Sequence, residues 1–167
     1  MMMTHQNYVL IDFQTGIRTD SWRVVDDGVM GGLSAGQFSL NDEGNGLFQG
    51  TVSLENNGGF SSVRCNFDAI DISAYTKILL KVKGDEKSYQ FRLKPNTDDR
   101  HSYINQIETT GEWQTIELLL ADFYPGFRGR QLPIPNYVPG QLEEIRFLIG
   151  NKKAEAFKLE IEKIELR

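Results

Sequence analysis

The sequence is poor in the residues that build metal centres and disulfide frameworks. Among its 167 residues it has one cysteine, Cys65, and two histidines, His5 and His101. A single cysteine cannot close an internal disulfide and offers a metal at most one thiolate, which favours a reducing compartment. We therefore expect neither a metal site nor a cofactor.

Long apolar runs and basic runs are also missing. No stretch approaches the roughly 18 apolar residues that a membrane span needs. The first residues lack a lysine or arginine followed by a long apolar stretch. The formal net charge is −5, and no basic cluster along the chain would attract a nucleic-acid backbone. We expect a cytoplasmic protein without membrane insertion and without a nucleic-acid partner.

The chain is rich in glycine and aromatic residues, and in several segments apolar and polar side chains alternate strictly. It has 16 glycines, 10 phenylalanines and 6 tyrosines, a composition that favours β-structure. Tyr89, Phe91 and Leu93 alternate with polar side chains, and residues 77–82, 115–120 and 145–149 show the same pattern. Because successive strand residues point to opposite faces, these segments are predicted to be half-buried strands.

In the C-terminal segment the alternation of apolar and polar residues shifts by one position. Phe157 to Ile161 are apolar at every second position, whereas Ile164 and Leu166 take the other phase, which predicts a bulge near Glu162 and Lys163. With about nine or ten strands and many turn signals, the pattern predicts a β-sandwich of two antiparallel sheets. We expect a single domain over residues 1–167.

One segment breaks the alternation. Residues 123–140 hold four of the five prolines, so this segment cannot be a central strand and is predicted to be a long ordered loop. Loops of this length are often functional. The alternative is that it covers a sheet edge with Phe127, Leu132 and Ile134.

Two glycine-rich segments lie beside acidic or amide residues, VVDDGVMGGLSAGQF at 24–38 and ENNGGFSSVR at 55–64. They fit irregular turns in which Asp26 and Asn57 accept backbone hydrogen bonds. A phosphate loop would need the lysine and the following helix that this segment lacks. A calcium site from Asp26, Asp27 and Glu55 has enough oxygens, but the spacing matches no loop template.

Catalytic groups are hard to assemble from this sequence. A pair of Cys65 and His101 would need a base and an orienting partner brought together by the fold. The adjacent Asp26 and Asp27 would point apart in an extended strand. Cys65 lies in an alternating run, as buried structural thiols do. We predict that the protein is not an enzyme.

Five segments together resemble a known family. The segments are SWRVVDDGVMGGLSAGQF, GLFQGTVSLENNGGFSSVR, LLKVKGDEKSYQFRL, TTGEWQTIELLLADFYPGFRGR and IRFLIGNKKAEAFKLEIEKI. In this order, from about Tyr8 to the end, the chain resembles the complex I intermediate-associated protein 30 domain. The resemblance implies a galactose-binding-like jelly-roll β-sandwich. It also implies a non-enzymatic role, because the mitochondrial members are assembly chaperones for membrane-arm intermediates of NADH:ubiquinone oxidoreductase.

Other members are fused to Rossmann-type nucleotide-binding domains. Because this sequence shows neither such a fusion nor an Arg-rich and Ser-rich transit segment, we expect a stand-alone bacterial relative.

The resemblance also suggests a binding patch. We expect Asp27 to pair with Arg64, with Asn57 and Arg128 adding hydrogen-bonding groups, either as a binding site or as a structural network. The residues of the expected patch are Trp22, Asp27, Met30, Ser34, Asn57, Arg64, Phe127 and Arg128.

Two functions follow. The first is a protein-binding module, an assembly factor or chaperone for respiratory complex I or another multi-subunit complex, whose partners would be subunits under assembly. The alternative is a module for a small carbohydrate or sugar phosphate, because jelly rolls often bind sugars on aromatic platforms.

Overall fold

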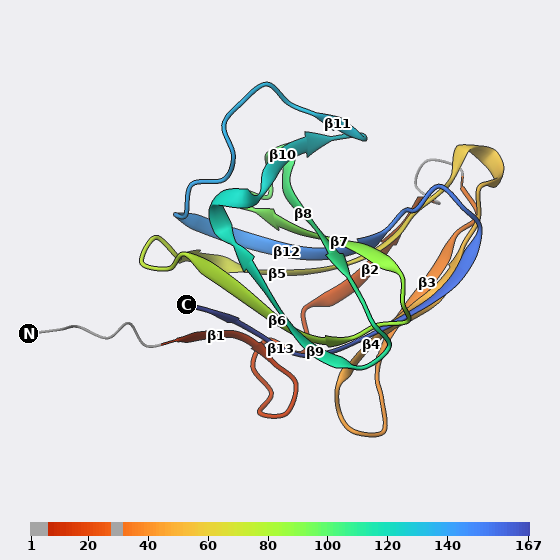
Figure 1. Ribbon diagram of the computed structural model, residues 1–167, viewed down its shortest axis with the longest axis horizontal. Coiled ribbons are helices and arrows are strands. Elements are labelled where there is room, and N and C mark those ends of the chain that lie inside the picture. The colour runs from red at the N-terminus through yellow and green to blue at the C-terminus, as the bar shows by residue number, and fades with distance from the viewer. Residues whose placement is uncertain (1–6, 28–31) are drawn as a thin grey trace, which may run out of the picture.

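The computed structural model describes residues 7–27 and 32–167. Two antiparallel β-sheets pack face to face, and both described ends of the chain lie in the same layer (Figure 1). Short 3-10 turns, η2 (Glu55–Asn57) and η3 (Leu120–Asp122), connect strands. No helix among the described residues is long and apolar enough to cross a membrane. The nearly all-β jelly-roll architecture predicted from the sequence is confirmed.

The first sheet has six strands. Their order is β3-β4-β13-β6-β9, with β1 also paired to β13. The strands are β1 (Tyr8–Asp12), β3 (Ala35–Leu40), β4 (Gly46–Val52), β6 (Lys77–Lys83), β9 (Trp113–Leu119) and β13 (Glu155–Leu166).

The second sheet has seven strands in the order β11-β10-β8-β7-β12-β5-β2. The strands are β2 (Trp22–Asp26), β5 (Ser61–Asp71), β7 (Ser88–Lys94), β8 (Ser102–Glu108), β10 (Tyr124–Phe127), β11 (Arg130–Gln131) and β12 (Gln141–Ile149). One face of this sheet packs on the core, and we call the opposite one its outer face.

The core lies between the two sheets and follows the predicted alternation. Tyr89, Phe91 and Leu93 of β7 are buried, and Phe91 packs on Phe147 of β12 with ring centroids 4.9 Å apart. Each such side chain contributes about 1.5–3 kcal/mol through the apolar area that it removes from water. The same periodicity leaves every second residue of these strands on the outer face.

The predicted phase change in β13 is confirmed. The register with β6 shifts between Ile161 and Lys163, which inserts one extra residue. Apolar side chains on both sides of this bulge, from Phe157 to Leu166, are therefore buried although they differ in phase. The first part of β13 pairs with β4 and the last part with β1, so the bulge lets one strand serve both partners.

The proline-rich segment 123–140 is only partly a loop, which corrects the prediction. It contains β10 and β11, a hairpin at the end of the seven-stranded sheet that rises above the other strands in Figure 1. With four and two residues, these strands are too short to show an alternating pattern in the sequence. For the same reason the described residues form thirteen strands, more than the about nine or ten expected.

Trp22 joins the two sheets at one edge. Its ring stacks on Phe38 of β3 at a centroid distance of 5.1 Å and also packs near Phe147. The indole Nε1–H donates a hydrogen bond of 2.9 Å to the carbonyl oxygen of Arg18. A half-buried tryptophan in this place stabilises the contact between the sheets.

We predict that Trp22→Ala lowers the free energy of unfolding by about 3 kcal/mol, because it removes the stacked ring and leaves a cavity. Urea denaturation measures this change. The control is Val138→Ala, at a side chain that is 76% exposed, where the cost should stay within about 0.5 kcal/mol. Equal losses in the two variants would contradict this role of Trp22.

Candidate functional site

Four arginines lie directly opposite one another across neighbouring strands on the outer face of the seven-stranded sheet. Arg92 of β7 is the cross-strand partner of Arg146 of β12, which pairs with Arg64 of β5, which in turn pairs with Arg23 of β2. Directly opposite side chains have Cβ atoms about 5 Å apart, and like charges in that position destabilise a sheet. We call these four residues the arginine row.

Burial makes the arginine row more costly. It lowers the pKa of Arg64 to about 10 and that of Arg92 to about 10, and the neighbouring charge of Arg146 adds to both shifts. Burial likewise lowers the pKa of Lys94, which lies two residues beyond Arg92. Arg64 and Arg92 stay charged at neutral pH, because a pKa of about 10 lies well above 7.

One carboxylate compensates part of this charge. Glu144 of β12 is 3% exposed; it accepts hydrogen bonds from Arg146 Nη2 at 3.0 Å and Asn66 Nδ2 at 3.2 Å. It also lies 3.8 Å from Arg64 Nη1. The Nε–H groups of Arg64 and Arg146 are buried and have no hydrogen-bond partner among the residues that the structure describes. The row therefore keeps an excess of positive charge and of unused donors.

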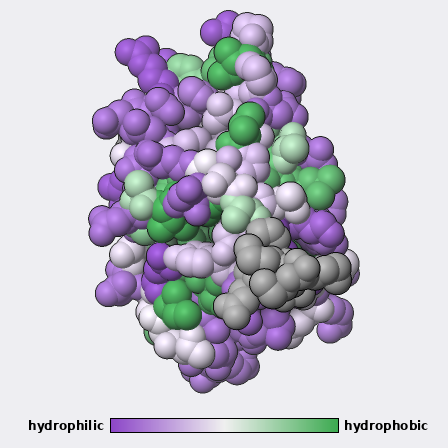
Figure 2. Space-filling model, turned by 90° about the vertical axis from the view of Figure 1, so that its left-hand side faces the viewer, coloured by the Kyte–Doolittle hydropathy of each residue, from purple (hydrophilic) through white to green (hydrophobic). Residues whose placement is uncertain are grey.

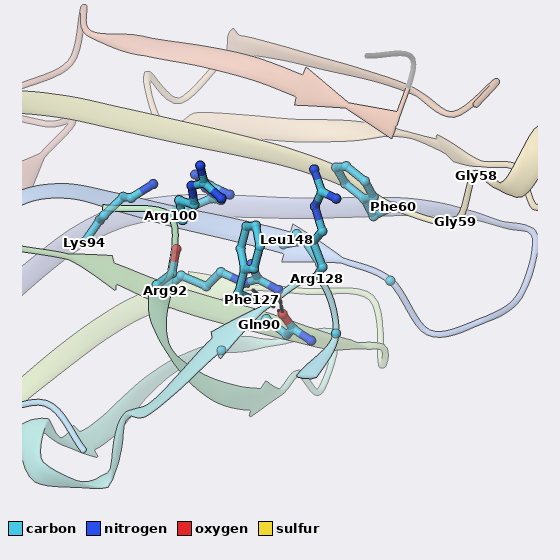
Figure 3. Close-up of a pocket in the computed structure, with 15 residues that line it drawn as sticks. Gly58, Gly59, Phe60, Gln90, Arg92, Lys94, Arg100, Phe127, Arg128 and Leu148 are labelled. Carbon is cyan, nitrogen blue, oxygen red and sulfur yellow. Dashed lines mark hydrogen bonds between the residues drawn. The ribbon is translucent and has the colours of Figure 1, made fainter. Parts of the chain in front are cut away.

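A pocket of about 460 Å³ lies against the arginine row (Figure 3). None of its described lining residues is acidic. The cationic lining residues are Arg92, Lys94, Arg100, Arg128 and Arg146. Phe60, Phe127, Leu148 and Gln90 supply apolar and amide surface. A chain with a net charge of −5 thus gathers five cationic side chains around one cavity.

Gln90 fixes the direction of Arg92. Its Oε1 accepts hydrogen bonds from Arg92 Nε at 2.9 Å and Nη2 at 2.6 Å, both drawn in Figure 3. The two residues are neighbours on the outer face because they are two apart on β7. The guanidinium is therefore positioned before any ligand binds.

A tight turn carries Arg128. Arg128 and Gly129 connect β10 to β11 with φ values of 49° and 77°, the pattern of a type I′ hairpin turn. The guanidinium of Arg128 lies 5.2 Å from the centre of the Phe127 ring. In Figure 3 it stands beside Phe60, across the cavity from Lys94 and Arg100. The segment FRGR thus builds one wall of the pocket.

Asp27 does not pair with Arg64, which corrects the expected contact. Its carboxylate accepts hydrogen bonds from the Ser34 hydroxyl at 2.5 Å, the Ser34 N–H at 3.0 Å and the Gly59 N–H at 2.7 Å. The Asp27 N–H donates to the carbonyl of Phe60, and Arg64 lies four positions further along the extended strand, about 13 Å away. Arg64 instead contacts Glu144.

Glycine explains why Asp27 can sit so close to other backbone. A Cβ on Gly32 would lie 2.3 Å from Asp27 Cγ, and one on Gly58 would lie 2.5 Å from Asp27 Oδ2. Burial by itself raises the pKa of Asp27, but the hydrogen bonds from Ser34, Gly59 and Phe60 outweigh it and hold the pKa below its ordinary value of 3.8. Asp27 and Ser34 form a structural network that joins the two glycine-rich segments.

The other residues of the expected patch are placed as follows. Arg64 belongs to the arginine row, and Phe127 and Arg128 line the pocket. Trp22 packs between the sheets. Met30 and the side chain of Asn57 lie outside the described part of the molecule. That this set of residues forms a binding patch stays a prediction.

The carboxylates considered for calcium have other partners. Asp26 accepts hydrogen bonds from the Gly36 N–H at 2.9 Å and from the hydroxyl of Ser61. Both oxygens of Asp27 are likewise occupied. Residues 7–27 and 32–167 contain no group of three or more histidine, cysteine or acidic side chains arranged to hold a metal.

Sequence reasoning did not single out the residues that line the outer face. These are Arg23, Gln90, Arg92, Lys94, Arg100, Glu144 and Arg146. A usable signal exists, since Arg23, Arg64, Arg92 and Arg146 each lie between two apolar residues, which is the pattern of a half-buried strand. Cys65, beside Arg64, faces the core, and burial raises the pKa of its thiol to about 12. It is therefore no nucleophile at neutral pH.

We predict that Asp27→Asn lowers the free energy of unfolding by about 2 to 3 kcal/mol at pH 7, because an amide cannot replace a carboxylate that accepts several N–H and O–H bonds. The folded pKa lies below 3.8, so the wild-type advantage is fully present above that pH and is lost as the pH falls through the folded pKa. Urea titrations between pH 2 and 7 measure it.

The matched control is Asp68→Asn, which removes the same charge from an exposed residue of β5 and should leave stability within about 0.5 kcal/mol. A gap between Asp27→Asn and wild type that grows as the pH is lowered would have the wrong sign and would refute the network.

Comparison with known proteins agrees with the fold. Two family 11 carbohydrate-binding modules of Clostridium thermocellum superpose on the chain. One, described in complex with a β-1,3-1,4-mixed-linked tetrasaccharide, has a TM-score of 0.67 and 18% identity over 96% of this chain and 94% of that one. The other, from a cellulosomal cellulase, has a TM-score of 0.70 and 17% identity over 98% and 95%. An agarase matches over 24% of its own length, with a TM-score of 0.61 and 13% identity, covering 98% of this chain.

A sequence relative is the mitochondrial complex I intermediate-associated protein 30 of Drosophila melanogaster. The alignment extends over 183 residues at 24% identity and covers 95% of this chain and 62% of the relative. The chain thus spans less than two thirds of that protein. The family model for complex I intermediate-associated protein 30 matches residues 11–161. The chain therefore belongs to the complex I intermediate-associated protein 30 family.

Proposed function

We propose that this chain is a non-enzymatic binding module that holds a partner protein on the outer face of its seven-stranded sheet. Its role would be that of an assembly factor or chaperone for respiratory complex I or another multi-subunit complex. Family membership supports the assembly role. The observation that carries the choice of surface is the arginine row beside a pocket lined by five cationic side chains.

The charge of this surface indicates what the partner presents. The pocket lining is cationic although the chain as a whole carries −5, so the outer face attracts acidic segments while the rest of the surface repels them. Such complementarity raises association rates and fixes the orientation of a complex. We therefore expect an acidic segment of a subunit under assembly.

A binding role agrees with the state of the reactive groups. The Cys65 thiol is buried and protonated at neutral pH, and Asp26 and Asp27 are engaged in hydrogen bonds. General bases and nucleophiles need a partner within hydrogen-bond reach in an accessible site.

A second candidate is a module for a small carbohydrate or sugar phosphate. The pocket of about 460 Å³ falls in the range of small-ligand sites, and Phe60, Phe127 and Gln90 offer apolar and amide contacts. The structural neighbours from Clostridium thermocellum are carbohydrate-binding modules. A neutral sugar would leave the arginine row without compensation, so this candidate favours an anionic sugar.

The cytoplasmic location stays a prediction from the sequence. The Drosophila melanogaster relative is named as a mitochondrial protein, and this chain covers only part of its length.

We predict that the double variant Arg100→Glu and Arg128→Glu loses capture of the partner protein from a lysate of the source cells, by roughly tenfold or more. Both side chains are exposed at the pocket, so the fold should be unaffected. Quantitative pull-down at low and high salt measures the effect, and wild-type capture should weaken as salt screens the charges.

The control is Lys158→Glu, an exposed position on β13 of the other sheet. It should leave capture unchanged. Undiminished capture by the double variant, with a melting temperature equal to that of wild type, would exclude the outer face as the partner surface.

A further inference from the structure

We infer that the pocket beside the arginine row is an oxyanion site that takes the phosphate group of a small phosphate monoester. This rests on the proposal that the outer face is the binding surface, and it names the chemistry of what binds there.

The group of Arg92, Arg146 and Lys94 carries an excess of positive charge. Arg92 and Arg146 are directly opposite, Lys94 is the cross-strand partner of Glu144, and the Glu144 carboxylate accepts a hydrogen bond from Arg146. Burial makes each positive charge harder to hold, and the arginines raise the cost for one another. A bound anion removes this cost, because it supplies the missing opposite charge at the same place.

The same residues also offer hydrogen-bond donors. A guanidinium carries five N–H groups. Gln90 accepts two hydrogen bonds from Arg92, and Glu144 accepts one from Arg146. The remaining N–H groups, together with the Lys94 ammonium, can serve a ligand in the pocket that all three residues line.

The charge of this cluster favours a phosphate monoester as the bound anion. A phosphate monoester carries about −1.5 to −2 charges at pH 7 and offers three strong acceptor oxygens. A single carboxylate carries one charge and two oxygens, so it compensates the cluster of Arg92, Arg146 and Lys94 less than a phosphate does, and an acidic protein segment would need several carboxylates there. Arginine forks match phosphate oxygens in pairs, and fixing one fork beforehand, as Gln90 does for Arg92, reduces the entropy lost on binding.

The pocket has room for more than the phosphate group. The cavity of about 460 Å³ is larger than a phosphate ion needs, and its remaining lining includes the rings of Phe60 and Phe127. In Figure 3 Phe127 stands between Arg92 and Arg128. An organic body such as a hexose fits this space, with its phosphate on the arginine row and its ring against the aromatic side.

The positive charges that would bind phosphate also destabilise the protein when no anion is bound. Removing one positive charge from the arginine row relieves repulsion in the empty protein and at the same time removes a phosphate ligand. The suitable variant is Arg92→Met, which keeps an apolar stem of similar length. Its hydrogen-bond partner Gln90 is only half-buried and can turn to water.

The test is the melting temperature of the full chain with inorganic phosphate, glucose 6-phosphate, glucose, or potassium chloride at matched ionic strength. Glucose 6-phosphate should raise it by about 5–10 °C at roughly 100 times its Kd, inorganic phosphate by less, and glucose or chloride not at all. Arg92→Met should melt about 2 °C higher than wild type without ligand and lose the phosphate shift.

The matched control is Lys158→Met on the other sheet, which removes the same charge and should keep the phosphate shift. An equal shift with glucose, a shift that survives Arg92→Met, or no shift beyond that of chloride would overturn the site. Equal shifts with inorganic phosphate and the ester would overturn the monoester as ligand.

The outcomes separate this inference from the proposed function. If Arg100→Glu with Arg128→Glu abolishes partner capture but glucose 6-phosphate shifts no melting curve, the oxyanion site fails and the protein-binding function stands. If glucose 6-phosphate binds while the double variant still captures its partner, the oxyanion site stands and the assignment of the partner surface fails.

Discussion

The cross-strand register of β2, β5, β12 and β7 is the constraint on which the outer face depends. Because successive side chains of a strand lie on opposite faces of the sheet, burying Phe91 and Phe147 in the core places Arg92 and Arg146 on the outer face. A slip of one residue in any of these strands would turn its arginine inward and its apolar side chains outward, so the apolar core holds the register in place. Burial between the sheets thus offsets the repulsion within the arginine row, and Glu144 reduces it only in part.

The sequence motifs divide into two physical roles. The glycine-rich segments around Asp27 solve a packing problem, because the carboxylate satisfies backbone N–H groups and Gly32 and Gly58 leave it room. The segment FRGR forms a turn with positive φ at Arg128, which carries a charge to the pocket that Gly58, Gly59 and Phe60 also line. One glycine-rich segment therefore belongs both to the Asp27 network and to the wall of the pocket, and the turn inside the proline-rich segment contributes to the same candidate site.

The family and the fold describe different aspects of this protein. Its sequence belongs to the complex I intermediate-associated protein 30 family, whereas its shape is shared with carbohydrate-binding modules at less than 20% identity. A shared fold does not transfer a ligand, because the ligand is chosen by the side chains on the surface. The hydrophobic side chains exposed at one end of the sandwich are scattered among hydrophilic ones (Figure 2). The pocket is distinguished by its charge instead, because five cationic side chains line it.

The sequence by itself determined the two-sheet architecture, the buried phase of each long strand and the bulge in β13, because burial and periodicity are local properties that alternation records. It did not determine that Asp27 faces Ser34 and Gly59, nor that Arg23, Arg64, Arg92 and Arg146 form one row. Each of those arginines could be recognised as outward-facing in its own strand. Which arginine lies beside which depends on strand order and register, and these are decided when the core packs and brings residues far apart in the chain to adjacent positions in the sheet.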